Sequence, residues 1–296
     1  MNNFELIAGS FIGRDHLYTG TGIRKMLMGG ENQDAFDFRI HDDRIIAVIA
    51  DGCGSSKHSA VGAQRGVRLF TEIIDRNLLR ASLGFTTVDL SNPKAFFARV
   101  KRDVVATLIE EVNRTGSNVS AIVKDYYLFT IVGLIITPKS TFIFSMGDGS
   151  YYINDTHTDL GPFLNNTPPY LGYCITGSPI TESNPDYLDL EIVELKTIEV
   201  NNILIASDGI RFLQEAEEEK VPGLKRTVGP ISQFWTNDFY YENPFHISRF
   251  LSLCGRDWIT INWDDRKITE ESSILRDDTT IISVRRKVIP ASGGAN

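Results

Sequence analysis

Five short runs of apolar residues predict β-strands along the chain. They lie at residues 44–50, 129–137, 141–146, 202–207 and 279–284, and each is six to nine residues long and rich in Ile, Val and Phe. That length favours a buried strand over a helix. The second and third runs are separated only by the turn Pro138-Lys139-Ser140, which indicates that they are antiparallel neighbours.

Two longer segments show the spacing of amphipathic helices. In residues 59–80 and 92–113, apolar residues recur at steps of three and four and form one face of each segment. Asn92 is an N-cap candidate that precedes Pro93 at the first helical position. Because the helices do not alternate regularly with the strands, the pattern predicts antiparallel sheets with helices outside them and disfavours a doubly wound parallel sheet.

The sequence shows no internal repeat, no low-complexity linker and no shift in composition that would mark a domain boundary. We therefore expect one domain over residues 1–289. Residues 290–296 read PASGGAN, and we expect them to form a disordered tail, because they contain too few large apolar side chains to pack.

Composition and charge are those of a globular protein and disfavour several partners. Of the 296 residues, 42% are apolar and 23% are charged, and the formal net charge of −8 disfavours a nucleic-acid partner. The three cysteines form no CxxC motif, which indicates a reducing compartment. The first residues lack a basic segment before a long apolar run, and no run reaches the roughly 18 apolar residues that span a membrane. We expect a cytoplasmic protein without a membrane partner.

Acidic residues stand where the predicted strands end. Two runs continue directly into an Asp-Gly pair and a third does so after Gly147, a fourth follows an Asp-Asp pair, and Asn32-Gln33-Asp34 precedes the stretch at residues 35–40. A single Asp-Gly pair suits a hairpin turn, because both residues tolerate positive φ, and this interpretation is strongest for Asp148-Gly149. The four pairs are Asp51-Gly52, Asp148-Gly149, Asp208-Gly209 and Asp277-Asp278.

Taken together, these pairs also fit a metal site. Several carboxylates would repel one another if they met, and each is costly to bury without a partner. A hard divalent cation, Mg²⁺ or Mn²⁺, would relieve that repulsion, since it prefers carboxylate and water oxygens. A Gly after the Asp would let the backbone approach the ion and offer a carbonyl oxygen. Spacing alone leaves the turn and the metal site open.

Five motifs, in their order along the chain, resemble those of the metal-dependent protein phosphatase 2C family. They are GENQDAF at 30–36, AVIADGCGSS at 47–56, FSMGDGSYYI at 144–153, LIASDGI at 204–210 and LRDDTTIISV at 275–284. Each motif is weak alone, whereas five in order form a strong signal. The resemblance extends from about Gly9 to Arg286 and is closest to the bacterial branch.

The resemblance implies a fold, an activity and partners. The fold is of the α+β class, a four-layer α-β-β-α sandwich in which two antiparallel sheets are flanked by helices. The activity is that of a Mg²⁺- or Mn²⁺-dependent protein-serine/threonine phosphatase, which hydrolyses phosphomonoesters with a water activated by two ions, and bacterial members hold a third ion. The substrate would be a protein that a cognate kinase has phosphorylated.

The resemblance also implies roles for two acidic residues and one carbonyl. Asp51 is similar to the carboxylate that bridges the two ions, and the Gly52 carbonyl is similar to a ligand of the first ion. Asp34 is similar to the acidic residue that holds metal-bound water. Asp34 and Asp51 are therefore the catalytic candidates.

Three further aspartates complete the implied metal site. Asp208 and Asp277 resemble the ligands of the second ion. Asp148 resembles the ligand of the third ion, although this chain reads GDGS where many members read GDSR. Asp278 is expected to lie behind Asp277 and to support it without binding an ion.

The stretch before the first acidic motif departs from the family pattern. The family commonly has an Arg there that grips the substrate phosphate, whereas this chain has MGGE at residues 28–31. Arg24 is the best substitute, ahead of Lys25 and Arg14. The alternative for Arg24 is a solvated position in a loop.

Cys53 stands where animal members of the family have a His, so either water or His58 would protonate the leaving group. Cys53 does not indicate a thiol phosphatase, because that chemistry needs an Arg six residues later and this chain has Ser59 there. The aromatic stretch NNTPPYLGY at residues 165–173 either packs against the edge of the core or forms a flap over the metal site.

Two other functions stay open on the sequence. One is a weakly active or inactive phosphatase-fold module that binds a phosphoprotein or a signalling partner, which the missing Arg favours and the complete set of aspartates opposes. The other is a metal-dependent hydrolase of small phosphoesters, which would share the site and differ only in its substrate.

Overall fold

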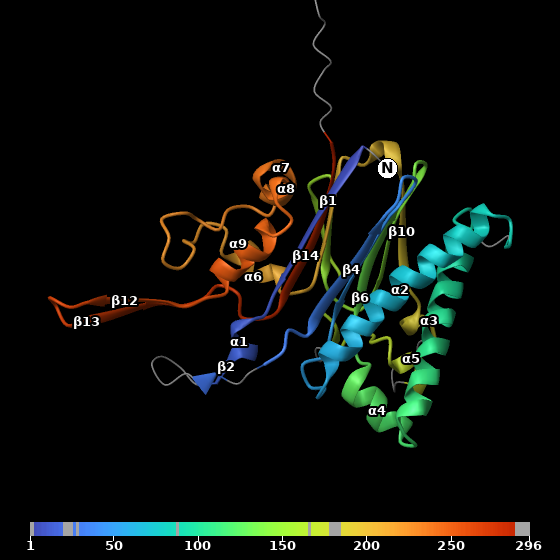
Figure 1. The fold of residues 1–296 in the computed structure, drawn as a ribbon, viewed down its shortest axis with the longest axis horizontal. Helices are drawn as coiled ribbons and strands as arrows, with labels where there is room; N and C mark the ends of the chain where they lie inside the picture. Colours follow the sequence, from blue (N-terminus) through green and yellow to red (C-terminus); the bar gives the residue numbers. More distant parts are fainter. Residues whose placement is uncertain are drawn as a thin grey trace, which may run out of the picture.

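In the computed structural model, residues 3–19, 26–27, 30–86, 89–164, 167–177 and 185–287 are described. Two five-stranded antiparallel sheets face each other, and helices cover the outer face of each sheet (Figure 1). This arrangement confirms the expected four-layer α-β-β-α sandwich. The expected tail at residues 290–296 lies outside the described residues.

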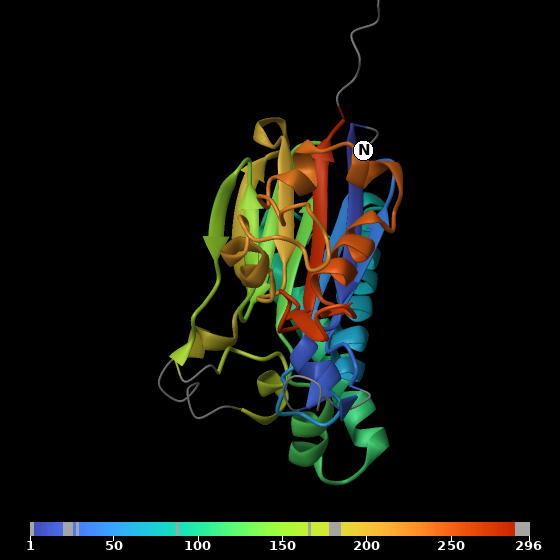
Figure 2. The same ribbon diagram turned by 90° about the vertical axis from the view of Figure 1, so that its left-hand side faces the viewer.

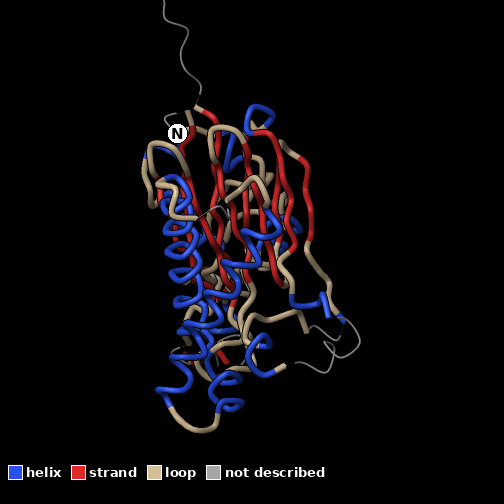
Figure 3. The backbone as a smooth tube through the Cα atoms, turned by 90° about the vertical axis from the view of Figure 1, so that its right-hand side faces the viewer, coloured by secondary structure: helices blue, strands red, loops and turns tan. Residues whose placement is uncertain are grey.

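One sheet packs against a layer of four helices, which Figure 3 shows in front of it. The ring centres of Phe97 and Phe144, which lie between the helices and the sheet, are 4.9 Å apart. In spatial order the strands are β10 (Glu191–Lys196), β7 (Ser140–Met146), β6 (Ile131–Ile136), β5 (Ile45–Asp51) and β4 (Asp34–Ile40). The helices are α2 (Ser59–Ser82), α3 (Pro93–Thr115), α4 (Val119–Tyr126) and α5 (Tyr173–Thr176).

The other sheet packs against a layer of shorter helices, which Figure 2 shows in front of it. Phe234 and Tyr240 are fully buried in this layer, with ring centres 5.0 Å apart. The strands are β1 (Phe4–Phe11), β14 (Thr279–Arg286), β11 (Asn202–Ala206), β8 (Ser150–Ile153) and β9 (Thr156–Asp159). The helices are α6 (Ile210–Glu215), α7 (Gln233–Thr236), α8 (Phe239–Glu242) and α9 (His246–Cys254).

The central strands are buried on both faces, which explains their continuous apolar sequences. In β5, Ile45 and Ile49 face the opposite sheet, whereas Ile46 and Val48 face the helices. A strand with two buried faces needs apolar side chains at odd and even positions alike. The polar residues of these strands are consequently displaced to the strand ends, and the acidic motifs lie there.

Small elements complete the described chain. They are α1 (Arg14–Leu17), β2 (Tyr18–Thr19), β3 (Met26–Leu27), the 3-10 helices Pro185–Leu188 and Thr197–Glu199, β12 (Trp258–Asn262) and β13 (Lys267–Glu271). The hairpin of β12 and β13 extends away from the sandwich (Figure 1). Among the helices of the described residues, none has the length and apolarity needed to cross a membrane.

The five predicted strands and both predicted helices are confirmed, with every end within two residues of the expected position. The N-cap of α3 is Asn92, whose side-chain oxygen accepts a hydrogen bond from the Ala95 backbone N–H at 3.2 Å. The hairpin interpretation of Asp148-Gly149 was wrong, because β7 and β8 belong to different sheets. The turn between them carries the chain across the sandwich, with Gly147 and Gly149 at φ of +96° and +129°.

Candidate active site

A pocket of about 170 Å³ opens where strands of both sheets end. Five of the six predicted metal-binding residues line it, and they come from four separate segments of the chain. The sixth, Asp34, lies directly opposite Asp51 in the pairing of β4 with β5. The lining residues are His16, Gln33, Asp51, Gly52, Cys53, Gly54, Asp148, Tyr170, Asp208 and Asp277.

Asp34 is buried behind the pocket, with a relative exposure of 5%. Its Oδ2 atom accepts a hydrogen bond from the Ser207 hydroxyl at 2.6 Å, whereas its Oδ1 atom is buried and has no hydrogen-bond partner among the described residues. Burial raises the pKa of Asp34 well above its usual range, and the nearby Asp278 raises it further. Burying a carboxylate oxygen without a partner costs free energy, which indicates that a cation or a proton donor binds to this oxygen in the functional state.

Asp51 ends β5 at the centre of this cluster. Burial raises the pKa of Asp51 well above its usual range, and repulsion from Asp34, Asp208, Asp148 and Asp277 adds to the increase. All the predicted acidic residues are therefore close enough to interact electrostatically with Asp51.

Asp208 lies in the turn between α6 and β11, a strand of the facing sheet. The glycine that follows Asp208 allows this turn to lie close to β14. A Cβ atom at Gly209 would lie 2.0 Å from the carbonyl oxygen of Asp278, so only glycine lets this turn approach β14 so closely. Burial raises the pKa of Asp208 to about 6, together with repulsion from Asp277, while Arg211 acts in the opposite direction. Burial likewise raises the pKa of Asp148, again against the effect of Arg211.

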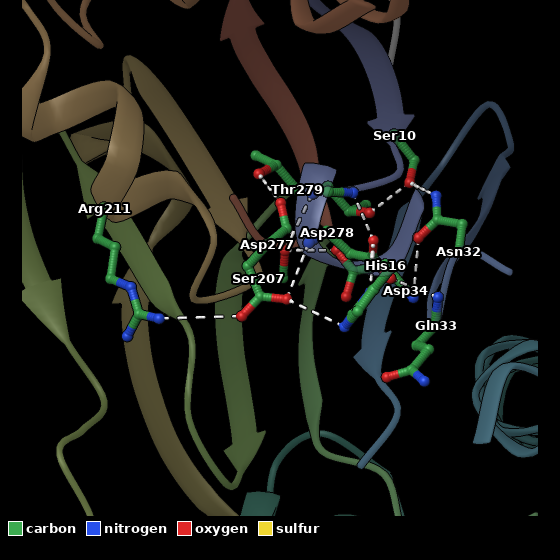
Figure 4. A network of polar contacts seen from close by, with 12 residues as sticks. Ser10, His16, Asn32, Gln33, Asp34, Ser207, Arg211, Asp277, Asp278 and Thr279 are labelled. Atoms are coloured by element: carbon green, nitrogen blue, oxygen red, sulfur yellow. Dashed lines mark hydrogen bonds and ion pairs between the residues drawn. The ribbon is translucent and has the colours of Figure 1, made fainter. Parts of the chain in front are cut away.

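Asp278 has a different role from its neighbour Asp277. It is buried and accepts hydrogen bonds from the backbone N–H groups of Gly13 at 2.6 Å and Gln33 at 2.5 Å (Figure 4). It is not among the lining residues, whereas Asp277 is. Asp278 thus ties the start of β14 to segments close to the N-terminal end.

His16 is a pocket residue that sequence reasoning missed. Its Nδ1 atom lies 2.9 Å from Asp278 Oδ1 and its Nε2 atom lies 3.8 Å from Asp277 Oδ1. The close contact with the Asp278 carboxylate raises the pKa of His16 against the opposing effect of burial. No motif includes this histidine, because it reaches the pocket through contacts with residues at the other end of the chain.

Arg211 is a second residue that sequence reasoning missed. Its Nη1 atom lies 3.4 Å from Asp208 Oδ2, and its Nη2 atom lies 3.8 Å from Asp277 Oδ2. Figure 4 shows Asp277 between Arg211 and His16. The available signal was a basic residue three positions after Asp208, at the start of a helix.

The remaining sequence candidates lie at different distances from the pocket. Arg24 lies outside the described residues. His58 stacks on Tyr126, with ring centres 4.7 Å apart, and is not among the lining residues. In the described part of the aromatic stretch, Leu171 is buried in the core and Tyr170 lines the pocket, so the segment packs against the core edge and also borders the site.

Cys53 lines the pocket beside the carboxylates. Its Sγ atom lies 3.1 Å from the Ser55 hydroxyl. Burial raises the pKa of the Cys53 thiol, but hydrogen bonds with Ser55 and Tyr170 outweigh burial and leave the pKa lowered.

The chemistry of the pocket fits a hard divalent cation. Its charged side chains are mainly carboxylates that raise one another's pKa, and one carboxylate oxygen of Asp34 has no hydrogen-bond partner where the structure is described. Oxygen ligands of this kind suit Mg²⁺ or Mn²⁺. Within the described residues, no group of three His, Cys, Asp or Glu side chains has converged to the geometry that holds an ion. The carboxylates thus line one pocket, but their oxygens are not arranged around a single ion position.

Comparisons with known proteins relate this chain to phosphatases. The sequence profile described as protein phosphatase 2C matches residues 21–245. A bacterial serine phosphatase is structurally similar, with a TM-score of 0.51 and 13% identity over 97% of this chain and 100% of that chain. The serine/threonine phosphatase Stp1 from Staphylococcus aureus has a TM-score of 0.50 and 13% identity, with 96% of each chain covered. At such identity the two structures show a common fold alone. A comparison with curated proteins found no match.

Proposed function

Because this chain belongs to the protein phosphatase 2C family, we propose that it is a metal-dependent protein-serine/threonine phosphatase that hydrolyses phosphomonoesters. The observation that supports this most is that four aspartates, at strand ends of both sheets, line one small pocket. A pocket of that charge attracts divalent cations and, without them, repels a phosphate.

The proposed metal site uses the chain's own carboxylates and one backbone carbonyl. The residues that would hold two Mg²⁺ or Mn²⁺ ions, with a third at Asp148, are Asp34, Asp51, Gly52, Asp148, Asp208 and Asp277. When bound, the ions would lower the pKa of a water molecule and offset charge on the phosphoryl oxygens. Asp51 interacts with all the other carboxylates, which favours it as the shared ligand.

Asp34 is proposed to orient the attacking water. The Ser207 hydroxyl fixes one oxygen of its carboxylate, and the backbone N–H of Thr280 fixes that hydroxyl at 2.9 Å. The other oxygen has no hydrogen-bond partner in the described part of the chain, so it is available to accept a hydrogen bond or a proton from water. The hydrogen bond from Ser207 thus limits the rotation of the carboxylate of Asp34.

We propose that the substrate is a protein that a cognate kinase has phosphorylated. We also propose that residues 1–289 act as one phosphatase domain. The single domain is supported by Gln33 and Asp277, which lie near opposite ends of the sequence and line the same pocket.

The purified protein with Mn²⁺ is expected to release phosphate from a phosphothreonine peptide and from p-nitrophenyl phosphate. Colorimetric detection of phosphate measures both reactions. Hydrolysis of p-nitrophenyl phosphate alone would contradict the proposed substrate and indicate a hydrolase of small phosphoesters. Binding of the peptide without hydrolysis of either compound would contradict the activity and indicate an inactive phosphatase-fold module.

Replacing Cys53 by Ser is expected to lower kcat by less than about fivefold, since a lost hydrogen bond is worth about 1 kcal/mol. The reason is that the proposed nucleophile is water, so the thiol of Cys53 does not attack phosphorus. Steady-state kinetics with p-nitrophenyl phosphate and Mn²⁺ measure the effect. Loss of turnover in a folded variant that still binds Mn²⁺ would show that the water mechanism is wrong for this chain.

A further inference from the structure

The guanidinium group of Arg211 lies beside the carboxylate pocket, and its contacts with the described residues leave N–H donors without a hydrogen bond. It lies within ion-pair distance of Asp208 and Asp277, at 3.4 and 3.8 Å. Within the described part of the chain, the side chain of Arg211 makes no hydrogen bond, and it is 51% exposed. Arginine carries five N–H donors in a fixed fork, so most of them remain available to an incoming anion.

The backbone that carries Arg211 is anchored in the core. Ile210 and Leu213, on the same short helix α6, are buried at 0% and 1% exposure. The guanidinium carbon lies 4.9 Å from the ring centre of Phe212, a distance that suits a cation–π contact. A side chain that is already restrained by such a contact loses less conformational entropy when it binds a ligand.

A phosphate monoester dianion needs positive charge at this pocket. The aspartates repel it until cations neutralise them, and the same neutralisation weakens their attraction for Arg211. The guanidinium would then turn its donors from carboxylate oxygens to phosphate oxygens. Arg–phosphate contacts are charge-assisted and frequently bidentate, which supplies both affinity and orientation.

We propose that Arg211 binds the phosphate of the substrate. The assignment rests on the proposed function and names a residue on α6, whereas the sequence pattern pointed to the segment before Asp34. Of the basic residues on α1, Arg14 is paired with Asp15 at 3.0 Å, and His16 lies 2.9 Å from Asp278. Arg211 contacts two of the lining carboxylates while keeping half of its side chain in solvent.

Three variants separate phosphate binding from a structural role. Arg211→Ala removes the charge and the fork, and Arg211→Lys keeps the charge without the fork. Arg249→Ala removes an exposed arginine from the outer face of α9 and serves as the matched control. Calorimetry measures Mn²⁺ affinity and the affinity of the Mn²⁺-loaded protein for inorganic phosphate, and steady-state kinetics give KM and kcat for p-nitrophenyl phosphate.

Arg211→Ala is expected to weaken phosphate binding and raise KM by about ten- to a hundredfold, the usual effect of losing a charge-assisted contact. Mn²⁺ affinity should stay within about threefold, Arg211→Lys should fall between wild type and Ala, and Arg249→Ala should match wild type. Unchanged phosphate affinity in Arg211→Ala would overturn the proposal. An equal change in Mn²⁺ and phosphate affinity would also overturn it, because Arg211 would then act on the carboxylates.

The phosphate measurement does not require turnover. If the wild-type protein binds phosphate through Arg211 but hydrolyses no ester, the proposed function fails and the assignment of Arg211 holds. If the wild-type protein hydrolyses p-nitrophenyl phosphate and Arg211→Ala keeps its KM and phosphate affinity, the assignment fails and the proposed function holds.

Discussion

Replacing Asp51 by Asn is expected to lower kcat about a thousandfold, because the variant loses the carboxylate that interacts with every other acidic residue of the site. Correctly placed ions contribute several kcal/mol to the transition state, and about 4 kcal/mol corresponds to that factor. Steady-state kinetics at saturating Mn²⁺ measure the loss. Calorimetric titration of the same variant should show weaker Mn²⁺ binding.

The same substitution is expected to stabilise the metal-free protein. Since the pKa of Asp51 is raised on folding, the folded chain binds a proton that the unfolded chain releases, and stability falls as the pH rises from the unfolded value of the pKa towards the folded one. Asn at this position removes the repulsion. A gain of about 1 kcal/mol would raise Tm by about 2 °C at neutral pH.

The matched control for Asp51→Asn is Asp42→Asn, the same chemical change in the exposed turn between β4 and β5. It should alter neither kcat nor Tm. An Asp51→Asn variant with wild-type kcat would contradict the role of Asp51. A lower Tm than wild type in the metal-free state would contradict the repulsion among the carboxylates.

Replacing Gly209 by Ala is expected to impair both folding and turnover. The new Cβ atom would lie 2.0 Å from the Asp278 carbonyl oxygen and 2.6 Å from Thr279 Oγ1, so the turn after β11 must move away from β14. Overpacking of this kind costs about 3 kcal/mol in the free energy of unfolding. Because Asp208 precedes this glycine, its displacement from Asp277 should lower kcat about a hundredfold.

Denaturant unfolding and steady-state kinetics measure the two effects of Gly209→Ala. The control is Gly116→Ala at the end of α3, where φ is 172° and the nearest atom to a new Cβ would be 3.5 Å away. This control should stay close to wild type in both measurements. If Gly209→Ala behaved like the control, the close approach of the two strands would not set the geometry of the site.

The central strands could be predicted from the sequence because both of their faces are buried. Continuous apolar runs such as that of β5 result from contact with a sheet on one side and helices on the other. The edge strands β1 and β10 could not be predicted, because their partly exposed faces mix polar and apolar residues. Helices α6, α7 and α8 have six residues or fewer, which is too short to show a period.

The candidate site was predictable through motif order and not through spacing. The Asp51-Gly52 and Asp208-Gly209 pairs suit turns equally well, and only their places on facing sheets bring the carboxylates together. His16 could not be predicted, because its acidic neighbours lie at the far end of the chain. Arg211 could have been predicted from the sequence, since it follows Asp208 by one helical turn. It was missed because the LIASDGI motif ends at residue 210, directly before it.

The most direct test of the account is phosphate release by one sample of wild-type protein before chelation, after exhaustive treatment with EDTA, and after Mn²⁺ is restored. Activity towards p-nitrophenyl phosphate should fall to background with EDTA and recover with Mn²⁺ or Mg²⁺, while the Asp51→Asn protein should not recover. This result is expected because the pocket carries carboxylates that would repel the substrate until cations neutralise them. Full activity after chelation would contradict the account, because the account assigns the activation of water to the bound ions.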